Sequence, residues 1–205
     1  ALRDIPGLVV GCPSRGDDAA TMLRTMMALA KVDGRVCAFL EPIALYMTKD
    51  LHEPGDGGWL TEYPSPEQAM RLGEERVYNP KAKDLVIFTF GNGVPMSLRA
   101  AKAIEAKHGW QVRVVDLRWL APLNEAAIAT HAGECERILV VDEGRRSAGV
   151  GEGIITAIAE AGYRARPFRR VVGADTFTPL AGAAFLVIPS DESIVAAADD
   201  LATRG

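Results

Sequence analysis

The sequence predicts an α/β fold, a three-layer α/β/α sandwich with a mostly parallel five-stranded sheet between two layers of helices. From residue 85 onward, short apolar runs typical of strands alternate with longer segments whose apolar residues recur at helical spacing. The run at 138–141 is apolar at four consecutive positions, which suits a strand covered on both faces, as in parallel sheets. A glycine-rich turn and an apolar helix follow it, and together they form half of a βαβ unit.

Three segments differ in character. Residues 1–46 read as strand, helix and strand, a unit too small to cover both faces of its own strands, so we expect the C-terminal end of a larger domain. Residues 47–83 are rich in proline and glycine and predict an interdomain linker, with Trp59 and Tyr63 as its anchors. Residues 84–205 predict the sandwich itself.

The first segment contains one clear amphipathic helix. Asp17 and Asp18 favour a helix start at 16–18, because carboxylates stabilise the positive end of the helix dipole. The apolar positions that follow at helical spacing are Met22, Leu23, Met26, Met27 and Ala30. We interpret the methionines as core residues; the alternative is a cofactor pocket, because methionine also adapts to irregular surfaces.

The sandwich segment supplies its elements in regular order. Strands are expected at 85–90, 112–117, 138–141 and 168–172. Helices are expected after the Gly91-Asn92-Gly93 turn, from Glu125 to about Ala132 with Asn124 as cap, and from Asp191 to the C-terminus. Residues 179–189 are expected to be irregular. Strand order does not follow from these patterns.

The glycine-rich turn after the 138–141 strand raises the question of phosphate binding. Gly149-Val150-Gly151-Glu152-Gly153 is G-x-G-x-G, not the dinucleotide pattern G-x-G-x-x-G. Glu152 also places a negative charge where a pyrophosphate would lie. We therefore predict that the glycines let the helix pack closely on the sheet.

Composition excludes several classes of protein. The chain has 205 residues, 48% hydrophobic and 24% charged, with a formal net charge of −4 and no long basic run, which argues against a nucleic-acid partner. Three cysteines without a C-x-x-C spacing indicate reduced thiols and a cytoplasmic protein. The apolar runs fall short of the roughly 20 residues that a membrane span needs. We expect no membrane partner.

No catalytic set is evident from the residues alone. Ser14 lacks the G-x-S-x-G context and is interpreted as a turn or cap residue. His52 is expected at the surface, and the other two histidines, His108 and His131, near helix ends. Asp142 and Glu143 end a predicted strand, where open α/β sheets place ligands, so an acid–base pair is the alternative to a structural role.

Several spaced motifs resemble one family. They are Gly91-Asn92-Gly93 after a strand, VVDLRWLAPLNEAAI at 114–128, VVDEGRRSAGVGEGI at 140–154 and VVGADTFTPLAGAAFLVIP at 171–189. They resemble the C-terminal domain of transketolase-like enzymes, most closely the beta subunit of thiamine-diphosphate-dependent 2-oxo acid dehydrogenases. The segment at 8–46 resembles the end of that family's pyrimidine-binding domain. Phe177 and the linker sequence HEPGDGGWLTEYP depart from the family pattern.

The resemblance implies an oxidoreductase of a multienzyme complex. The reaction would be oxidative decarboxylation of a 2-oxo acid, branched-chain or pyruvate, with acyl transfer to lipoyl groups, using thiamine diphosphate and magnesium. The implied partners are an alpha subunit or fused alpha domain, a second beta subunit and a dihydrolipoyl acyltransferase. The family's activating glutamate and active-site histidine match no position here, so we assign no catalytic or cofactor-binding residue.

The chain is therefore expected to be a C-terminal piece, a scaffold and docking part that is inactive alone and binds no cofactor. Gly55-Asp56-Gly57 matches the family's diphosphate and magnesium motif only superficially. The resemblance also implies a structural potassium ion held by the backbone carbonyls of Ala30, Asp33 and Arg35, although the family usually has asparagine in place of Arg35. The alternatives are a fragment of transketolase or deoxyxylulose phosphate synthase, or a free-standing module that docks an acyltransferase.

Overall fold

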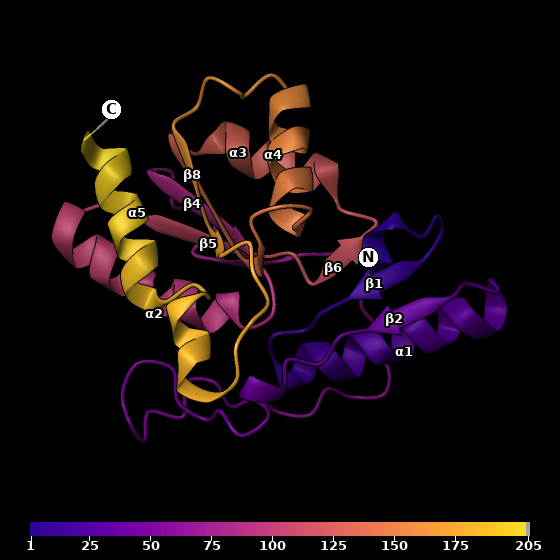
Figure 1. Ribbon diagram of the computed structural model, residues 1–205. Helices are drawn as coiled ribbons and strands as arrows, with labels where there is room; N and C mark the ends of the chain where they lie inside the picture. Colours follow the sequence, from indigo (N-terminus) through magenta and orange to yellow (C-terminus); the bar gives the residue numbers. More distant parts are fainter. Residues whose placement is uncertain (204–205) are drawn as a thin grey trace. The chain divides into compact units, whose positions relative to one another are not determined.

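The computed structural model describes residues 1–203, which form two compact units. The first unit comprises residues 1–76, 90–92 and 116–124, and the second comprises 77–89, 93–115 and the chain from 125 onward. Each unit has its own sheet. The strand orders are β2-β1-β6 in a three-stranded sheet and β3-β5-β4-β7-β8 in a five-stranded sheet (Figure 1).

The first unit begins with a short 3₁₀ helix η1 (Leu2–Asp4), followed by β1 (Val9–Gly11), α1 (Gly16–Val32), β2 (Cys37–Phe39) and η2 (Ile43–Leu45). Strand β1 pairs with β2 in parallel and with β6 (Trp119–Ala121) antiparallel. Of the helix positions predicted as core, Met22 and Met26 are buried against Val9 and Trp119. Met27 is exposed, so the prediction was wrong for that methionine, and Leu23 and Ala30, at the same helical spacing, are exposed as well.

The second unit contains β3 (Arg76–Tyr78), whose first residue belongs to the first unit, then β4 (Leu85–Thr89), α2 (Gly93–His108), β5 (Val112–Asp116), whose last residue belongs to the first unit, and α3 (Glu125–Glu134). The remaining elements are β7 (Arg137–Arg145), α4 (Val150–Glu160), β8 (Phe168–Gly173), η3 (Ala181–Leu186) and α5 (Asp191–Thr203). Strand β7 pairs in parallel with both β4 and β8.

The second unit is the predicted α/β/α sandwich. Helices α2 and α5 pack together on one face of the sheet, and α3 and α4 pack together on the other (Figure 1). Leu85, Ile87, Leu139 and Val141 belong to the core cluster that includes α2 and α5. Their neighbours in sequence are equally buried and point to the opposite layer, as Phe88 does toward His131 of α3. Both faces of the strands are therefore covered, which explains their unbroken apolar sequences.

Three segments differ from the sequence prediction. The fifth strand of the large sheet is β3, which lies before residue 84, because three half-buried residues give no alternating pattern to detect. The expected strand at 112–117 ends at Asp116, and β6 follows it in the other sheet. The segment at 179–189, expected to be irregular, contains the 3₁₀ helix η3.

The sequence prediction found no apolar run long enough to span a membrane, but one C-terminal stretch meets that criterion. Ala181–Thr203 is long and apolar enough to cross a membrane by length and composition alone. Its helix α5, however, buries Ile194 and Leu201 in the core of the second unit. Asp191 and Asp199 of α5 form ion pairs with α2. These contacts identify α5 as a packed helix of the sandwich.

Candidate functional site

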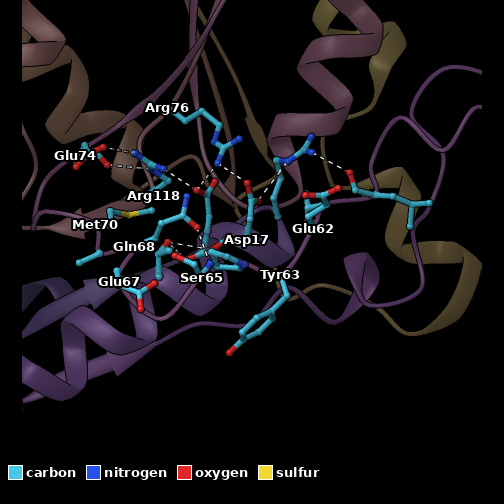
Figure 2. A pocket seen from close by; sticks show the side chains of 17 residues that line it. Asp17, Glu62, Tyr63, Ser65, Glu67, Gln68, Met70, Glu74, Arg76 and Arg118 are labelled. Carbon is cyan, nitrogen blue, oxygen red and sulfur yellow. Dashed lines mark hydrogen bonds and ion pairs between the residues drawn. The ribbon is translucent and has the colours of Figure 1, made fainter.

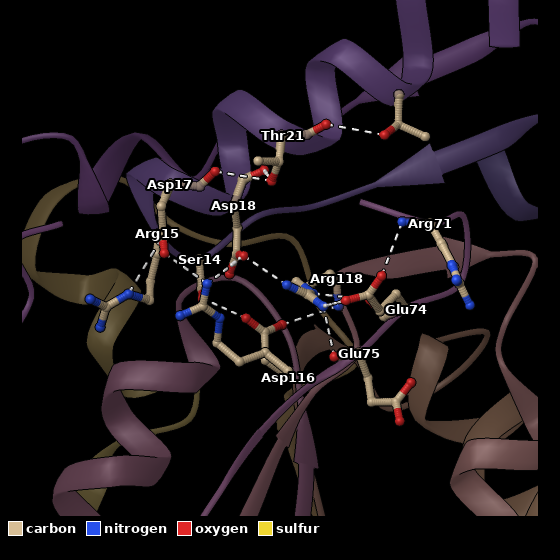
Figure 3. A network of polar contacts seen from close by, with 12 residues as sticks. Ser14, Arg15, Asp17, Asp18, Thr21, Arg71, Glu74, Glu75, Asp116 and Arg118 are labelled. Atoms are coloured by element: carbon tan, nitrogen blue, oxygen red, sulfur yellow. Dashed lines mark hydrogen bonds and ion pairs between the residues drawn. The ribbon is translucent and has the colours of Figure 1, made fainter. Parts of the chain in front are cut away.

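A buried carboxylate in the first unit lies at the end of β5. Asp116 is fully buried, and it accepts hydrogen bonds from Ser14 Oγ (2.5 Å) and from the backbone N–H of Arg118 (3.1 Å) (Figure 3). Burial raises the pKa of Asp116 to about 7, and the charge of Asp18 acts in the same direction, against the opposing effects of Ser14 and Arg118. Asp116 is therefore placed to change its protonation state near neutral pH.

A second buried carboxylate, Asp18, comes from the first turn of α1. Its Oδ1 accepts hydrogen bonds from Arg118 Nη1 at 2.7 Å and from Arg76 Nη2 at 2.8 Å. Arg76 also contacts Asp17 Oδ2 at 2.7 Å. Burial alone would lower the pKa of Arg76, but the two aspartates raise it, so this cation stays charged. The prediction that Asp17 and Asp18 favour the helix start omitted this ion-pair network.

Arg118 connects the network to the chain that precedes β3. Its Nε and Nη2 donate to the carbonyl oxygens of Glu74 (3.0 Å) and Glu75 (2.7 Å). Its backbone adopts a positive φ of 58°, which is uncommon for a residue other than glycine. A single side chain thus fixes the helix start, the linker and the start of β6 within the first unit.

The network borders an open cleft of about 1010 Å³ in the first unit (Figure 2). Its walls are the first turns of α1 and the linker residues 60–70. Arg24 holds this part of the linker by donating to the carbonyls of Pro64, Ser65 and Gln68. Of the two predicted linker anchors, Trp59 is buried and its indole N–H donates to the Ser14 carbonyl at 3.2 Å, whereas Tyr63 is exposed.

The predicted acid–base candidate Asp142 is held by backbone groups of its own turn. It is buried, and its carboxylate accepts hydrogen bonds from the backbone N–H groups of Gly144 (2.7 Å) and Gly151 (2.8 Å). A Cβ on Gly149 would lie 2.7 Å from Asp142 Oδ2. The glycine-rich turn therefore wraps a carboxylate of the chain itself, where a nucleotide-binding turn would hold phosphate. Its neighbour Glu143 is half-buried.

The histidines lie apart in chemically different environments. His131 Nδ1 is 2.9 Å from Nη1 of the buried Arg113, so this ring nitrogen acts as an acceptor for the guanidinium. His108 contacts Asp199 at 2.8 Å and stacks on Trp110. His52 is exposed, as predicted. These contacts account for His108 and His131 without a catalytic role.

The positions predicted for potassium surround the end of α1. Ala30, Asp33 and Arg35 are exposed, and the N–H groups of Asp33 and Arg35 both donate to the Leu29 carbonyl, with Gly34 between them at φ 66°. The ion itself stays a prediction. The magnesium and diphosphate that the family implies do not fit the residues described here. Within 1–203, no three His, Cys, Asp or Glu side chains are grouped as a metal needs, and the turn N–H groups serve Asp142.

The Asp116–Arg118 pair and its connection to Ser14 and Asp18 were not predicted from the sequence. One signal was present, because Asp116 lies at the carboxyl end of a buried strand, and the carboxyl ends of strands are where sites form. The pairing itself was not accessible from the sequence, since Ser14 and Asp116 are 102 positions apart and Asp18 and Arg118 are 100 apart.

Comparison with known proteins agrees with this architecture. Residues 74–194 match the family described as transketolase, C-terminal domain, and the chain belongs to this family. It is 30% identical over 196 residues to the pyruvate dehydrogenase E1 component subunit beta of Staphylococcus aureus, and 29% identical to that of Staphylococcus epidermidis. Each alignment covers 95% of this chain and 55% of the relative, so the chain spans about half the length of these relatives.

A solved structure shares the fold. A chain described as "Split gene transketolase, inactive beta4 tetramer" superimposes with a TM-score of 0.73 at 21% identity. The superposition covers 98% of this chain and 59% of that one. The resemblance to transketolase-like enzymes and the α/β fold class are thereby confirmed.

Proposed function

We propose that this chain is the C-terminal portion of the decarboxylating component of a 2-oxo acid dehydrogenase complex. The observation that carries the proposal is the similarity to pyruvate dehydrogenase E1 beta subunits along 95% of the chain, across both units. The complete component would oxidatively decarboxylate pyruvate or a branched-chain 2-oxo acid with thiamine diphosphate and transfer the acyl group to a lipoyl group. Three free cysteines, two of them buried, are compatible with the cytoplasm as its location.

Within that component we propose a scaffolding and docking role for this chain. The buried polar groups described above hold segments of the chain together: Asp142 fastens a turn, and Arg118 fastens the linker. The chain's partners would be an alpha subunit or fused alpha domain, a second beta subunit and the acyltransferase. The split transketolase structure described as an inactive tetramer of beta chains supports the idea that such a chain assembles without turnover.

The test has two arms with the purified 205-residue chain. In the first, decarboxylation of pyruvate and of 3-methyl-2-oxobutanoate is assayed with thiamine diphosphate and magnesium, and no turnover is expected. In the second, the chain is passed over an immobilised peripheral subunit-binding domain of a dihydrolipoyl acyltransferase, and retention is expected. Turnover by the chain alone would contradict the scaffolding role. Absence of retention would favour the transketolase or deoxyxylulose phosphate synthase alternatives.

A further inference from the structure

The cleft of the first unit has more negative than positive groups. Five carboxylate side chains and three guanidinium side chains line it. The guanidinium groups are already engaged: Arg76 binds Asp17 and Asp18, Arg118 binds Asp18, and Arg15 donates to the Leu60 carbonyl at 3.2 Å. The hydrogen-bonding capacity that remains on these charged groups is that of the carboxylate acceptors and of one donor, Arg15 Nε.

Two of these acceptors are buried and lack a donor within residues 1–203. Asp18, which is 1% exposed and lines the cleft, has no hydrogen-bond partner for Oδ2. Asp17 Oδ1 also has none, since Arg15 Nε lies 3.6 Å away, at ion-pair distance. Buried carboxylate oxygens are nearly always hydrogen-bonded in folded proteins, so Asp18 Oδ2 beside this cleft indicates a missing donor. Asp17 Oδ1 forms an ion pair with Arg15 Nε, which also has no hydrogen-bond partner.

We propose that this cleft binds a small organic cation that carries primary ammonium or guanidinium groups. Such a ligand supplies both positive charge and N–H donors for Asp17 and Asp18. A bare metal ion fits less well, because the described residues offer no group of three metal-ligating side chains. The cleft volume, about 1010 Å³, leaves room for an extended polyamine or for a lysine or arginine side chain of another protein.

The rim of the cleft favours the same ligand chemistry. Tyr63 lines it and already has the Arg24 guanidinium 5.4 Å from its ring centroid, so its ring can attract cations. Glu67 at the rim has a pKa held below its usual value by its own backbone N–H and by Ser65, so it is ionised at neutral pH. Glu62 adds a further exposed carboxylate.

Calorimetric titration of the purified chain tests the proposal. Spermidine, the tripeptide acetyl-Lys-Lys-Lys-amide and tetramethylammonium chloride are titrated at equal ionic strength. Saturable binding is expected for spermidine or the peptide and none for tetramethylammonium, which carries a single positive charge and no N–H donor. Tighter binding of spermidine identifies a free amine as the ligand, and tighter binding of the peptide identifies the side chain of a partner. Absence of saturable binding by both, or equal binding of tetramethylammonium, overturns the proposal.

Variants locate the site. D17N is expected to weaken binding about tenfold through loss of a half-buried charge, and E62Q up to about fivefold through loss of an exposed one. The matched control E160Q removes an exposed carboxylate at the end of α4 in the second unit and should bind like the unmodified chain. Circular dichroism checks the folding of each variant. If D17N does not fold, the comparison of E62Q with E160Q tests the site. Equal affinity of D17N, E62Q and E160Q would overturn the site. These outcomes do not depend on the proposed function.

Discussion

Asp116 and Asp142 are both buried aspartates in strands of the large sheet, yet they are stabilised in different ways. Asp116 relies on Ser14, on the N–H of Arg118 and on the nearby Arg118 charge. Asp142 receives backbone N–H groups from Gly144 and from Gly151, within the first turn of α4. One carboxylate therefore depends on side chains distant in sequence, and the other on local backbone at a helix N-terminus.

The difference shows what each site can tolerate. Backbone donors remain in place when side chains change. The Asp142 site is therefore sensitive mainly to substitutions that add a side chain at one of the turn glycines. The Asp116 site depends on side chains that can be replaced singly, and it also contains the paired charges of Asp18 and Arg76. Removing one member leaves the others buried with fewer compensating charges.

The largest expected effect follows from removing the central cation. Arg118→Met keeps the side-chain length but leaves Asp18, which is 1% exposed, with Arg76 as its remaining cation. We expect a loss of about 3–5 kcal/mol in the free energy of unfolding, the range for breaking a buried ion pair. Urea unfolding followed by tryptophan fluorescence measures it, because Trp59 and Trp119 lie buried in the same unit.

Two further variants test whether the loss of stability comes from the broken ion pair. Arg164→Met removes an exposed arginine of the second unit and should change stability by less than about 0.5 kcal/mol. Combining Arg118→Met with Asp18→Asn should recover part of the loss, since the buried charge that loses one of its two cations is then gone. If Arg118→Met proved as mild as Arg164→Met, the network would contribute nothing to folding.

A smaller effect is expected at the glycine-rich turn. Gly149→Ala would place a Cβ 2.7 Å from Asp142 Oδ2 and 3.0 Å from the Arg145 carbonyl oxygen, at a φ of −73° that any residue adopts. The cost is therefore steric, and we expect about 1–3 kcal/mol by the same urea assay. Gly182→Ala is the matched control, because a Cβ there meets nothing within 4 Å. Equal stability of the two variants would show that Asp142 can move away from the turn.

The fold was largely predictable because unbroken apolar runs indicate strands that are buried on both faces. The runs at 85–90 and 138–141 became β4 and β7, with helices on both faces. Strand β6 could not be predicted, because Trp119–Ala121 is a three-residue strand that pairs with β1, more than 100 positions earlier. Short strands whose partners are distant in sequence leave no periodic pattern.

The candidate site was less predictable than the fold. The close packing of the turn glycines followed from their spacing, and Gly151 indeed contacts Asp142. Met22 and Met27 lie on the same predicted helical stripe, but only Met22 is buried, because burial depends on which residues of the sheet and linker reach the helix. The ion pair of Asp18 with Arg118 depends on tertiary structure alone.

The last prediction is a pH dependence at Asp116, tested with Asp116→Asn. Because burial raises the folded pKa of Asp116 from 3.8 to about 7, the folded protein keeps a proton that the unfolded chain releases between these values. Stability from this group is complete below pH 4 and is lost as pH rises toward 7, by at most about 1.4 kcal/mol per pH unit. Asparagine cannot titrate, so the stability of Asp116→Asn relative to the unmodified chain should rise from pH 4 to 7 and level off above. Urea unfolding at pH 5, 6, 7 and 8 measures this difference.

Ser14→Ala tests the cause, since loss of a hydrogen bond that lowers the pKa of Asp116 should move the levelling-off to higher pH. Parallel stability curves for Asp116→Asn and the unmodified chain would show that Asp116 does not titrate in this range.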